Sequence, residues 1–327
     1  MGFDEVLGNG RVKKILRLAL QRNRVPNSLI FSGPEGVGKK SLARVLAQAI
    51  NCEREKADAC GVCPTCRAIA GCRLPDVWEI KPEGQEIKIE QMRALKQAAY
   101  LRPMIARKRV FIIEEAEKMN EPAANSLLKT LEEPPLFSHI ILLTSNPHLL
   151  LPTILSRCQI LHFVAVGKEE IRQVLTDKGL PEEKARLLSV IVGGNLDKAL
   201  DADWQEIQAE RSAAWNIFLS FFGRGDISTF LESYGFSRRS LVRDELERIL
   251  EILASFGRDL MLLQVKGEPS FLLNPDFAAG METLKKGVGV EKSWRFLERV
   301  DGVISGLEKN LNLGVLVSAF CTLTGGD

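Results

Sequence analysis

A glycine-rich run has the residue types and spacing that phosphate binding requires. The run Gly33-Pro34-Glu35-Gly36-Val37-Gly38-Lys39 follows a short apolar segment and precedes a helical pattern. Glycines let backbone N–H groups curl around phosphate oxygens, the start of the helix adds a positive dipole, and Lys39 reaches the terminal phosphates. The run predicts a phosphate-binding loop (P-loop); an ordinary glycine-rich turn is the alternative.

The residue after the loop lysine departs from this pattern. A Ser or Thr hydroxyl at that position would ligate Mg²⁺, but the sequence has Lys40, and Ser41 comes one position late. One helical step rotates a side chain by about 100°, and the Lys40 ammonium lies where the ion would need an oxygen. The sequence therefore predicts a degenerate nucleotide site and makes ATP with Mg²⁺ a questionable cofactor.

An acidic pair, Glu114-Glu115, follows the apolar run of residues 110–113. At the end of a strand such a pair commonly partners a phosphate loop, because one carboxylate holds Mg²⁺ and the next polarises the attacking water. The first acid is usually Asp, and the extra methylene of Glu114 crowds the metal. A solvated strand end is the alternative.

Four cysteines form a second group, and their spacing suits metal binding. They follow the pattern C-x7-C-x2-C-x2-C and are Cys52, Cys60, Cys63 and Cys66. Four thiolates this close can make a tetrahedral site, for which Zn²⁺ is the commonest ion. The segment carries Gly and Pro and little apolar surface, which argues against simple packing. We predict a structural zinc site over residues 52–66, with an iron–sulfur cluster as the alternative.

The other cysteines and the histidines lack partners at such spacing. We expect three cysteines to be small buried hydrophobic residues: Cys72, Cys158 and Cys321. We expect three histidines to be structural: His139, His148 and His162.

The periodicity of the chain changes along its length. Short apolar runs at 29–31, 77–80, 110–113, 140–143 and 160–163 alternate with helical patterns at 11–21, 40–51, 91–100 and 122–131. Apolar strands separated by helices predict an α/β domain, with a parallel sheet covered on both faces. Helical patterns follow at 168–178 and 182–192, then dominate from about 204. We expect three domains: 1–163, 164–204 and 205–327.

Composition narrows the class of protein. The chain has 327 residues, 45% hydrophobic and 26% charged, which is typical of a globular protein with more than one domain. The start shows no secretion signal and no run approaches the roughly 20 apolar residues of a membrane helix, so we expect a cytoplasmic protein without membrane contact. The net charge of +2 leaves nucleic-acid binding open. A candidate basic edge, with a solvated loop as the preferred alternative, comprises Arg102, Arg107, Lys108 and Arg109.

Four segments in order carry a family resemblance. They are the phosphate loop, the cysteine group, the run N-S-L-L-K-T-L-E-E-P-P at 125–135, and Ser156-Arg157-Cys158. Together they resemble bacterial clamp-loader subunits of the AAA+ class, closely over residues 1–163, moderately over 164–203 and weakly thereafter. The resemblance implies a P-loop AAA+ parallel-sheet domain with an inserted zinc knuckle, then a helical lid domain and an all-α C-terminal collar domain. We expect the C-terminal domain to be the main assembly surface, with a simple core as the alternative, because its helical patterns carry many large apolar residues: Phe256, Leu260, Leu263, Trp294 and Phe296.

Within the family, three departures favour the delta-prime branch over the ATP-hydrolysing gamma/tau branch. They are Lys40, Glu114, and Asp197, which stands near the position where active relatives carry a sensing arginine. The resemblance implies a nucleotide site that has lost hydrolysis and is built from Gly33, Gly36, Gly38, Lys39, Lys40, Glu114, Glu115 and Asn146. It also implies that Arg157 acts in trans, as an arginine finger, on the ATP of a neighbouring subunit.

The implied partners are gamma/tau and delta clamp-loader subunits and, through the complex, the sliding clamp and primer–template DNA. The chain would thus serve DNA polymerase III, whose other subunits carry out polymerisation, and would itself hydrolyse negligible ATP. One alternative is an active gamma/tau-type motor that uses Lys39 and Glu115. Another is a zinc-dependent nucleic-acid adaptor, which the nearly neutral set of charges at 53–58 disfavours. Without the resemblance, Arg157 would be interpreted as a helix cap.

Overall fold

The computed structural model describes residues 2–200, 203–222, 243–265, 267–308 and 311–321. The chain divides into two compact units, residues 1–200 and residues 201–327. The expected boundaries of the sheet domain, the lid and the collar stay predictions.

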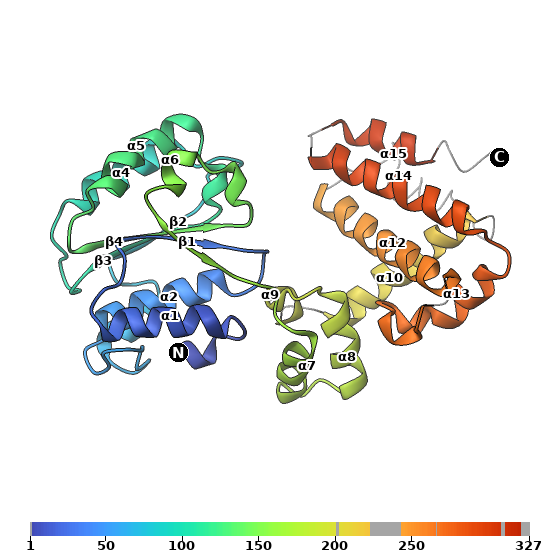
Figure 1. Ribbon diagram of the computed structural model, residues 1–327, viewed down its shortest axis with the longest axis horizontal. Coiled ribbons are helices and arrows are strands. Elements are labelled where there is room, and N and C mark those ends of the chain that lie inside the picture. Colours follow the sequence, from blue (N-terminus) through green and yellow to red (C-terminus); the bar gives the residue numbers. More distant parts are fainter. Residues whose placement is uncertain (1, 201–202, 223–242, 266, 309–310, 322–327) are drawn as a thin grey trace. The chain divides into compact units, whose positions relative to one another are not determined.

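The first unit is built on a five-stranded sheet in the order β2-β3-β4-β1-β5 (Figure 1). The strands are β1 (Ser28–Ser32), β2 (Val77–Ile80), β3 (Arg109–Ile113), β4 (Ser138–Thr144) and β5 (Gln159–His162). All neighbouring strands are parallel, and β1, β3 and β4 are buried along their whole length. Strands covered on both faces need apolar residues at successive positions, which is why these runs were visible in the sequence.

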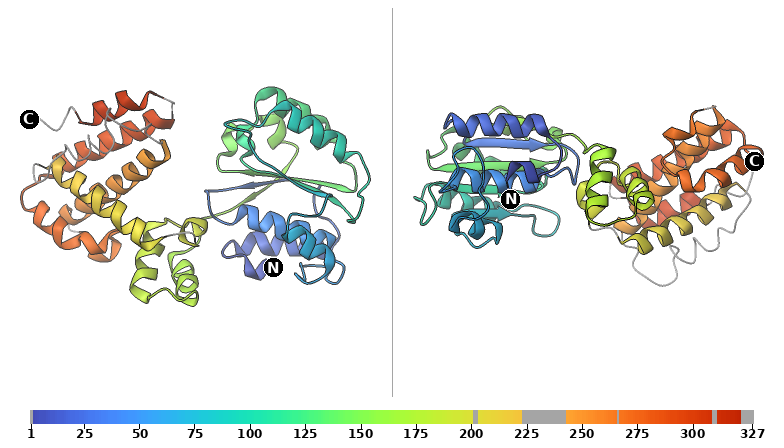
Figure 2. Two further views of the ribbon diagram at one scale, coloured as in Figure 1. Left: turned by 180° about the vertical axis from the view of Figure 1, so that it is seen from behind. Right: turned by 90° about the horizontal axis from the view of Figure 1, so that it is seen from below.

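Helices cover both faces of the sheet, as the views from front, back and below show (Figures 1 and 2). One face carries α1 (Gly10–Gln21), α2 (Lys39–Asn51) and α3 (Pro64–Ala70), and the other carries α4 (Ile89–Ala99), α5 (Glu121–Glu132) and α6 (Pro152–Leu155). Alternate β1 residues serve the two layers: Phe31 packs in the cluster with α2, and Ile30 in the cluster with α4 and α5. The predicted α/β fold is confirmed.

Short 3₁₀ turns and three further helices complete the first unit. The turns are η1 (Phe3–Glu5), η2 (Ala116–Lys118) and η3 (Pro147–Leu149), and the helices are α7 (Lys168–Asp177), α8 (Glu182–Ile191) and α9 (Leu196–Leu200). The helix α9 begins after the turn at Gly193-Gly194, where both glycines have left-handed φ angles of +57° and +92°. This turn matters because it brings the start of α9 back to the phosphate loop.

The described part of the second unit is helical. It contains α10 (Trp204–Phe221), α12 (Arg243–Gln264), η4 (Pro269–Phe271), η5 (Pro275–Phe277), α13 (Ala278–Lys285), α14 (Val290–Glu308) and α15 (Leu313–Cys321). Its core includes Phe218, Phe256 and Phe296. Of the apolar residues that suggested a partner-facing surface, Phe256, Leu260, Leu263 and Phe296 are buried in this core, and Trp294 is 53% exposed. Among the described residues, no helix combines the length and apolar content needed to span a membrane.

Candidate nucleotide and zinc sites

The phosphate loop connects β1 to α2 and depends on its glycines. Gly36 and Gly38 have φ angles of +65° and +86°, in the left-handed region that favours glycine. A Cβ on Gly36 would lie 1.7 Å from Oδ1 of Asn195, and the N–H of Leu196 donates to the Gly36 carbonyl at 2.8 Å. The start of α9 therefore lies directly on the loop, at a distance that only glycine permits.

The loop lysine is held by its own loop. Lys39 Nζ donates to the carbonyl oxygens of Gly33 and, at 2.6 Å, of Pro34. Burial lowers the pKa of Lys39, and the nearby carboxylates of Glu117, Glu35 and Asp197 partly oppose that shift. The Lys39 ammonium is therefore bonded to neutral carbonyl oxygens of the loop itself.

Lys40 and Glu114, the two unusual residues of the motif, form an ion pair with each other. Lys40 Nζ lies 2.9 Å from Glu114 Oε1 and 3.8 Å from Glu79 Oε2. Burial lowers the pKa of Lys40, but the hydrogen bond and charge of Glu114 outweigh it, so the pKa lies above its usual range. Glu79 in turn receives two hydrogen bonds from Arg44, from Nε at 2.5 Å and from Nη2 at 2.6 Å.

These contacts decide whether Mg²⁺ fits this site. The ion requires oxygen ligands at 2.0–2.1 Å in octahedral geometry. Here the carboxylate that would hold it is bonded to an ammonium, and position 40 offers a positive charge in place of a hydroxyl. The residues present do not fit a magnesium ion.

The second acid of the pair is engaged as well. Glu115 adopts a left-handed conformation, with φ of +49°, and its Oε2 lies 2.5 Å from Nζ of Lys118. Glu117, which the sequence analysis did not select, accepts hydrogen bonds from the N–H of Ser145 at 3.0 Å and from its Oγ at 2.6 Å. Burial raises the pKa of Glu117, but these hydrogen bonds outweigh it and hold the pKa below its usual range.

A pocket of about 340 Å³ lies where these residues meet. It is lined by Glu35, Gly36, Gly38, Lys39, Lys40, Glu114, Glu115, Glu117, Leu143, Thr144, Ser145 and Asp197. Most of the predicted set is therefore together, and Asp197 joins it from α9. Asn146 is exposed outside this lining, where its Oδ1 accepts a hydrogen bond from the N–H of His148 at 3.2 Å and caps η3.

Arg157 follows α6 and does not line this pocket. Its Nε donates to Oε1 of Glu132 at 2.8 Å, and its Nη1 donates to the carbonyl of Thr153 at 2.9 Å. The guanidinium is part of the exposed surface. Glu132 belongs to the N-S-L-L-K-T-L-E-E-P-P run, so two of the family-like segments meet here.

The four predicted cysteines converge at the other end of α2. Their Sγ atoms all lie within 4.8 Å of one another, with 4.0 Å between Cys60 and Cys66. Zn–S bonds of 2.3 Å in a tetrahedron place sulfurs about 3.8 Å apart. Backbone N–H groups of Glu55, Cys63 and Cys66 each donate to a cysteine sulfur at 3.3 Å.

Hydrogen bonds favour the thiolate form at one of the four cysteines, whereas burial raises the pKa of Cys66. The N–H of Cys63 is the main cause that lowers the pKa of Cys60 to about 6, which favours the thiolate form that metals bind. Gln48 Nε2 of α2 donates to the Cys66 carbonyl at 2.8 Å, and Asp58 accepts from Arg17 Nη2 at 2.8 Å. These contacts anchor the segment to α2 and α1. The donor set fits a structural zinc ion.

The remaining cysteines and histidines gave mixed outcomes. The prediction that Cys72 is buried is wrong: its side chain is exposed, with Sγ 3.7 Å from Nη2 of Arg44. Cys158 is partly buried, and burial raises its pKa to about 12. The side chain of Cys321 lies outside the described residues. His139 is buried, with Nδ1 3.1 Å from the Pro26 carbonyl, whereas His148 and His162 are exposed.

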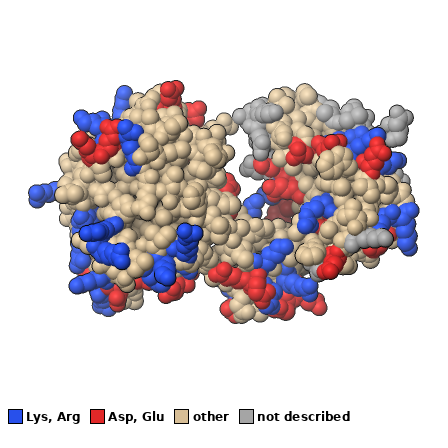
Figure 3. Space-filling view, in the orientation of Figure 1, with Lys and Arg blue, Asp and Glu red and all other residues tan. Residues whose placement is uncertain are grey.

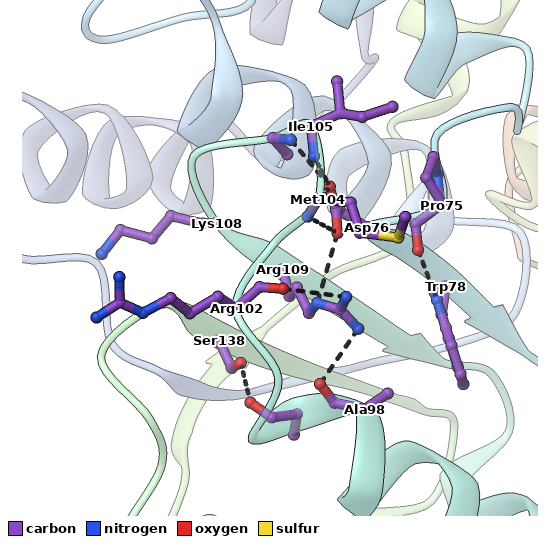
Figure 4. Close-up of polar contacts among 12 residues, drawn as sticks. Pro75, Asp76, Trp78, Ala98, Arg102, Met104, Ile105, Lys108, Arg109 and Ser138 are labelled. Atoms are coloured by element: carbon purple, nitrogen blue, oxygen red, sulfur yellow. Dashed lines mark hydrogen bonds and ion pairs between the residues drawn. The ribbon is translucent and has the colours of Figure 1, made fainter.

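Arg109 corrects the interpretation of the basic run. Figure 4 shows it inside the unit, with Nε 3.4 Å from Oδ1 of the buried Asp76. Asp76 also accepts backbone N–H bonds from Met104, Ile105 and Ala106 at 2.7–3.0 Å. Burial raises the pKa of Asp76, but these donors and Arg109 hold it below its usual range. Arg109 is a structural anchor of the loop after α4 and takes no part in a basic surface.

The anchored loop carries apolar side chains in solvent. Met104 and Ile105 are 76% and 68% exposed although their backbone is bonded to Asp76. Lys108 Nζ donates a hydrogen bond to the Leu136 carbonyl at 2.6 Å. On the face shown in Figure 3, positive and negative side chains are interspersed and form no single basic stripe.

Known proteins resemble this chain in sequence and fold. A family model described as "DNA polymerase III, delta subunit" matches residues 8–167. The chain is 37% identical to DNA polymerase III subunit tau of Salmonella typhimurium over 63% of its own length and 33% of that protein. It is 34% identical to the delta' subunit of Bacillus subtilis over 62% of its length and 61% of that protein.

The chain spans about a third of the length of the tau subunit that it matches. Among solved structures, a DNA polymerase III gamma subunit-related protein of Thermotoga maritima aligns with a TM-score of 0.55 at 18% identity, covering 95% of this chain and 98% of that chain. At this identity the likeness concerns the fold alone.

Proposed function

This chain belongs to the clamp-loader family of AAA+ proteins, and on that premise we propose that it is a delta-prime-type subunit of the replicative clamp loader. In this role it helps an ATP-driven complex to load the sliding clamp on primed DNA. Its partners are gamma/tau and delta subunits directly, and the clamp and primer–template DNA through the complex, all in the cytoplasm. It serves DNA polymerase III without carrying out polymerisation.

The ion pair between Lys40 and Glu114 carries this proposal. At 2.9 Å it joins the side chains at the two positions that would supply ligands to a magnesium ion. Phosphoryl transfer depends on that ion to neutralise developing charge. Asp197 lines the pocket from α9 and adds a negative charge where hydrolysis needs a positive one. A subunit with these residues holds its place in the complex without turning over ATP.

Arg157 is the group through which such a subunit acts on its neighbour. It lies outside the pocket of its own chain, and its guanidinium is exposed beside Glu132. An arginine is always charged and engages two phosphate oxygens at once. We assign it to the ATP of the adjacent subunit, where it stabilises the transition state in trans.

A gamma/tau-type motor is the second candidate, and the identity of 37% to a tau subunit favours it. In that case Lys39 and Glu115 would be the working residues. In this structure, however, Lys39 is bonded to its own loop and Glu115 to Lys118.

ATP turnover by the purified chain distinguishes the two candidates. We expect turnover that does not exceed that of Lys39→Ala, because Lys40 and Glu114 are paired with each other and supply no free ligand for a magnesium ion. A robust rate that Lys39→Ala abolishes would overturn the delta-prime assignment and establish the motor.

A further inference from the structure

The misfit between this pocket and Mg²⁺ has a consequence for ligand binding. We infer that the Lys40 ammonium replaces the divalent ion as a fixed counter-charge, so that the pocket binds a nucleoside polyphosphate without any metal. The inference rests on the proposed function, because it assumes a site that binds without hydrolysing. It goes further by stating the chemical form of the ligand: metal-free ATP or ADP.

The ion network leaves Lys40 able to serve a phosphate. Glu114 has a second cation within reach, since Lys81 Nζ lies 3.9 Å from its Oε1. Glu79, the other carboxylate near Lys40, is already neutralised by two hydrogen bonds from Arg44. Lys40 can therefore turn towards a phosphate oxygen while both carboxylates keep a positive partner. A site in which Lys40 were the sole counter-charge would oppose that movement.

The phosphate loop supplies the rest of the cradle. Gly36 and Gly38 keep the left-handed angles that curl the loop, and α2 directs its N-terminal dipole into the pocket. Lys39 is bonded to two carbonyl oxygens of the loop. Phosphate oxygens are better acceptors for an ammonium than neutral carbonyls, because a charged acceptor strengthens the bond.

The acids around the pocket limit the affinity and provide a test. Glu115 is paired with Lys118, and Glu117 is hydrogen-bonded by Ser145. Glu35 and Asp197 also line the pocket and act on the charge of Lys39. They repel a polyphosphate, so we expect weak binding. Removing the charge in Asp197→Asn should tighten it.

The first experiment uses the wild-type full chain and needs no variant. Binding of ATP and ADP is measured by isothermal titration in excess EDTA and again in excess Mg²⁺, with unfolding temperature as a second readout. We expect the two dissociation constants to agree within about threefold, because a fixed ammonium makes the ion superfluous. Binding that Mg²⁺ strengthens by more than about tenfold would contradict the inference.

Variants then test the role of Lys40 itself. Lys40→Ala should weaken binding several-fold in EDTA, and the exposed Lys88→Ala is its matched control. The double change Lys40→Thr with Glu114→Asp restores a hydroxyl and a shorter acid, so binding should become dependent on Mg²⁺. Equal binding by Lys40→Ala and wild type would contradict the inference.

Failure of the inference is separable from failure of the proposed function. If neither the wild-type chain nor Asp197→Asn binds ATP or ADP in EDTA, the inference is wrong, yet a chain that binds no nucleotide remains a non-hydrolysing subunit. If the wild-type chain hydrolyses ATP with Mg²⁺, the proposed function itself falls.

Discussion

The two ends of helix α2 carry two sites with opposite internal chemistry. At its N-terminus, Lys39 and Lys40 begin the helix and are bonded to groups of the same chain. At its C-terminus, Cys52 caps the helix, and its sulfur converges with three others within 4.8 Å. At the N-terminal end, the charged side chains are paired with other groups of the chain. At the C-terminal end, four sulfur donors converge on one point.

This difference indicates which of the two ends suits a metal ion. Thiolates that converge repel one another and are stable together only around a cation. The carboxylates of the pocket need no ion, since Glu114 has Lys40 and Glu115 has Lys118. Proximity of suitable residues is thus insufficient; what matters is whether the same chain already supplies the counter-charge.

Removal of zinc should have the largest effect. Structural zinc contributes about 10–16 kcal/mol to the folding of small zinc-finger peptides, so Cys63→Ser should lose the metal and unfold the 52–66 segment. The measurement is zinc content by mass spectrometry together with hydrogen exchange of that segment. Cys72→Ser is the control, because Cys72 is exposed and outside the cluster. Zinc content well below one equivalent in the wild-type chain would contradict the proposed zinc site at the C-terminal end of α2.

Loss of the internal cation should have an intermediate effect. Lys40→Ala removes the 2.9 Å partner of Glu114, whose side chain is only 17% exposed. Leaving a largely buried acceptor short of a partner costs about 1–3 kcal/mol. We expect a loss near the lower bound, because Lys81 remains, and hydrogen exchange of β1 and β3 measures it.

An exposed ion pair provides the control for the stability of Lys40→Ala. Lys88 and Glu83 are 3.5 Å apart and both exposed, so Lys88→Ala should cost less than about 0.5 kcal/mol. Equal stability of Lys40→Ala and wild type would mean that the pocket charges are not mutually satisfied.

The smallest expected effect is a change in pH dependence. The Arg44 hydrogen bond is the main cause that lowers the pKa of Glu79 in the folded chain. A carboxyl with a depressed folded pKa contributes stability that is fully present above its unfolded pKa, about 4.3, and is lost as pH falls through the folded value. Glu79→Gln should therefore flatten the fall in unfolding temperature below about pH 4.5. An unchanged acid profile would show that the Arg44–Glu79 contact adds nothing.

The sequence predicted elements and short motifs well, because these depend on neighbouring residues. All five apolar runs became strands, and the loop and the cysteines were found from spacing alone. It failed where a residue's partner lies far along the chain. Arg109 looked basic and exposed beside Lys108, but its buried partner Asp76 comes from the loop before β2 and is brought close by the pairing of β2 with β3.

Glu117 was missed for a related reason. It stands three residues after Glu114, in a turn whose direction no local pattern reveals, and its partner Ser145 follows β4. The sheet order places the ends of β3 and β4 side by side. That order, and with it the pocket's full set of acids, could not be deduced from residue spacing.

We propose that this chain contributes an arginine to its neighbour and no ATPase of its own. The most direct test is ATP turnover by a loader reconstituted with partner subunits, clamp and primed DNA, with either Lys39→Ala or Arg157→Ala in this chain. We predict wild-type turnover for Lys39→Ala and a clear loss for Arg157→Ala in a complex that still assembles, since an arginine finger raises the rate at its site by about 10³–10⁵. The opposite pattern, with turnover lost in Lys39→Ala and kept in Arg157→Ala, would contradict the account.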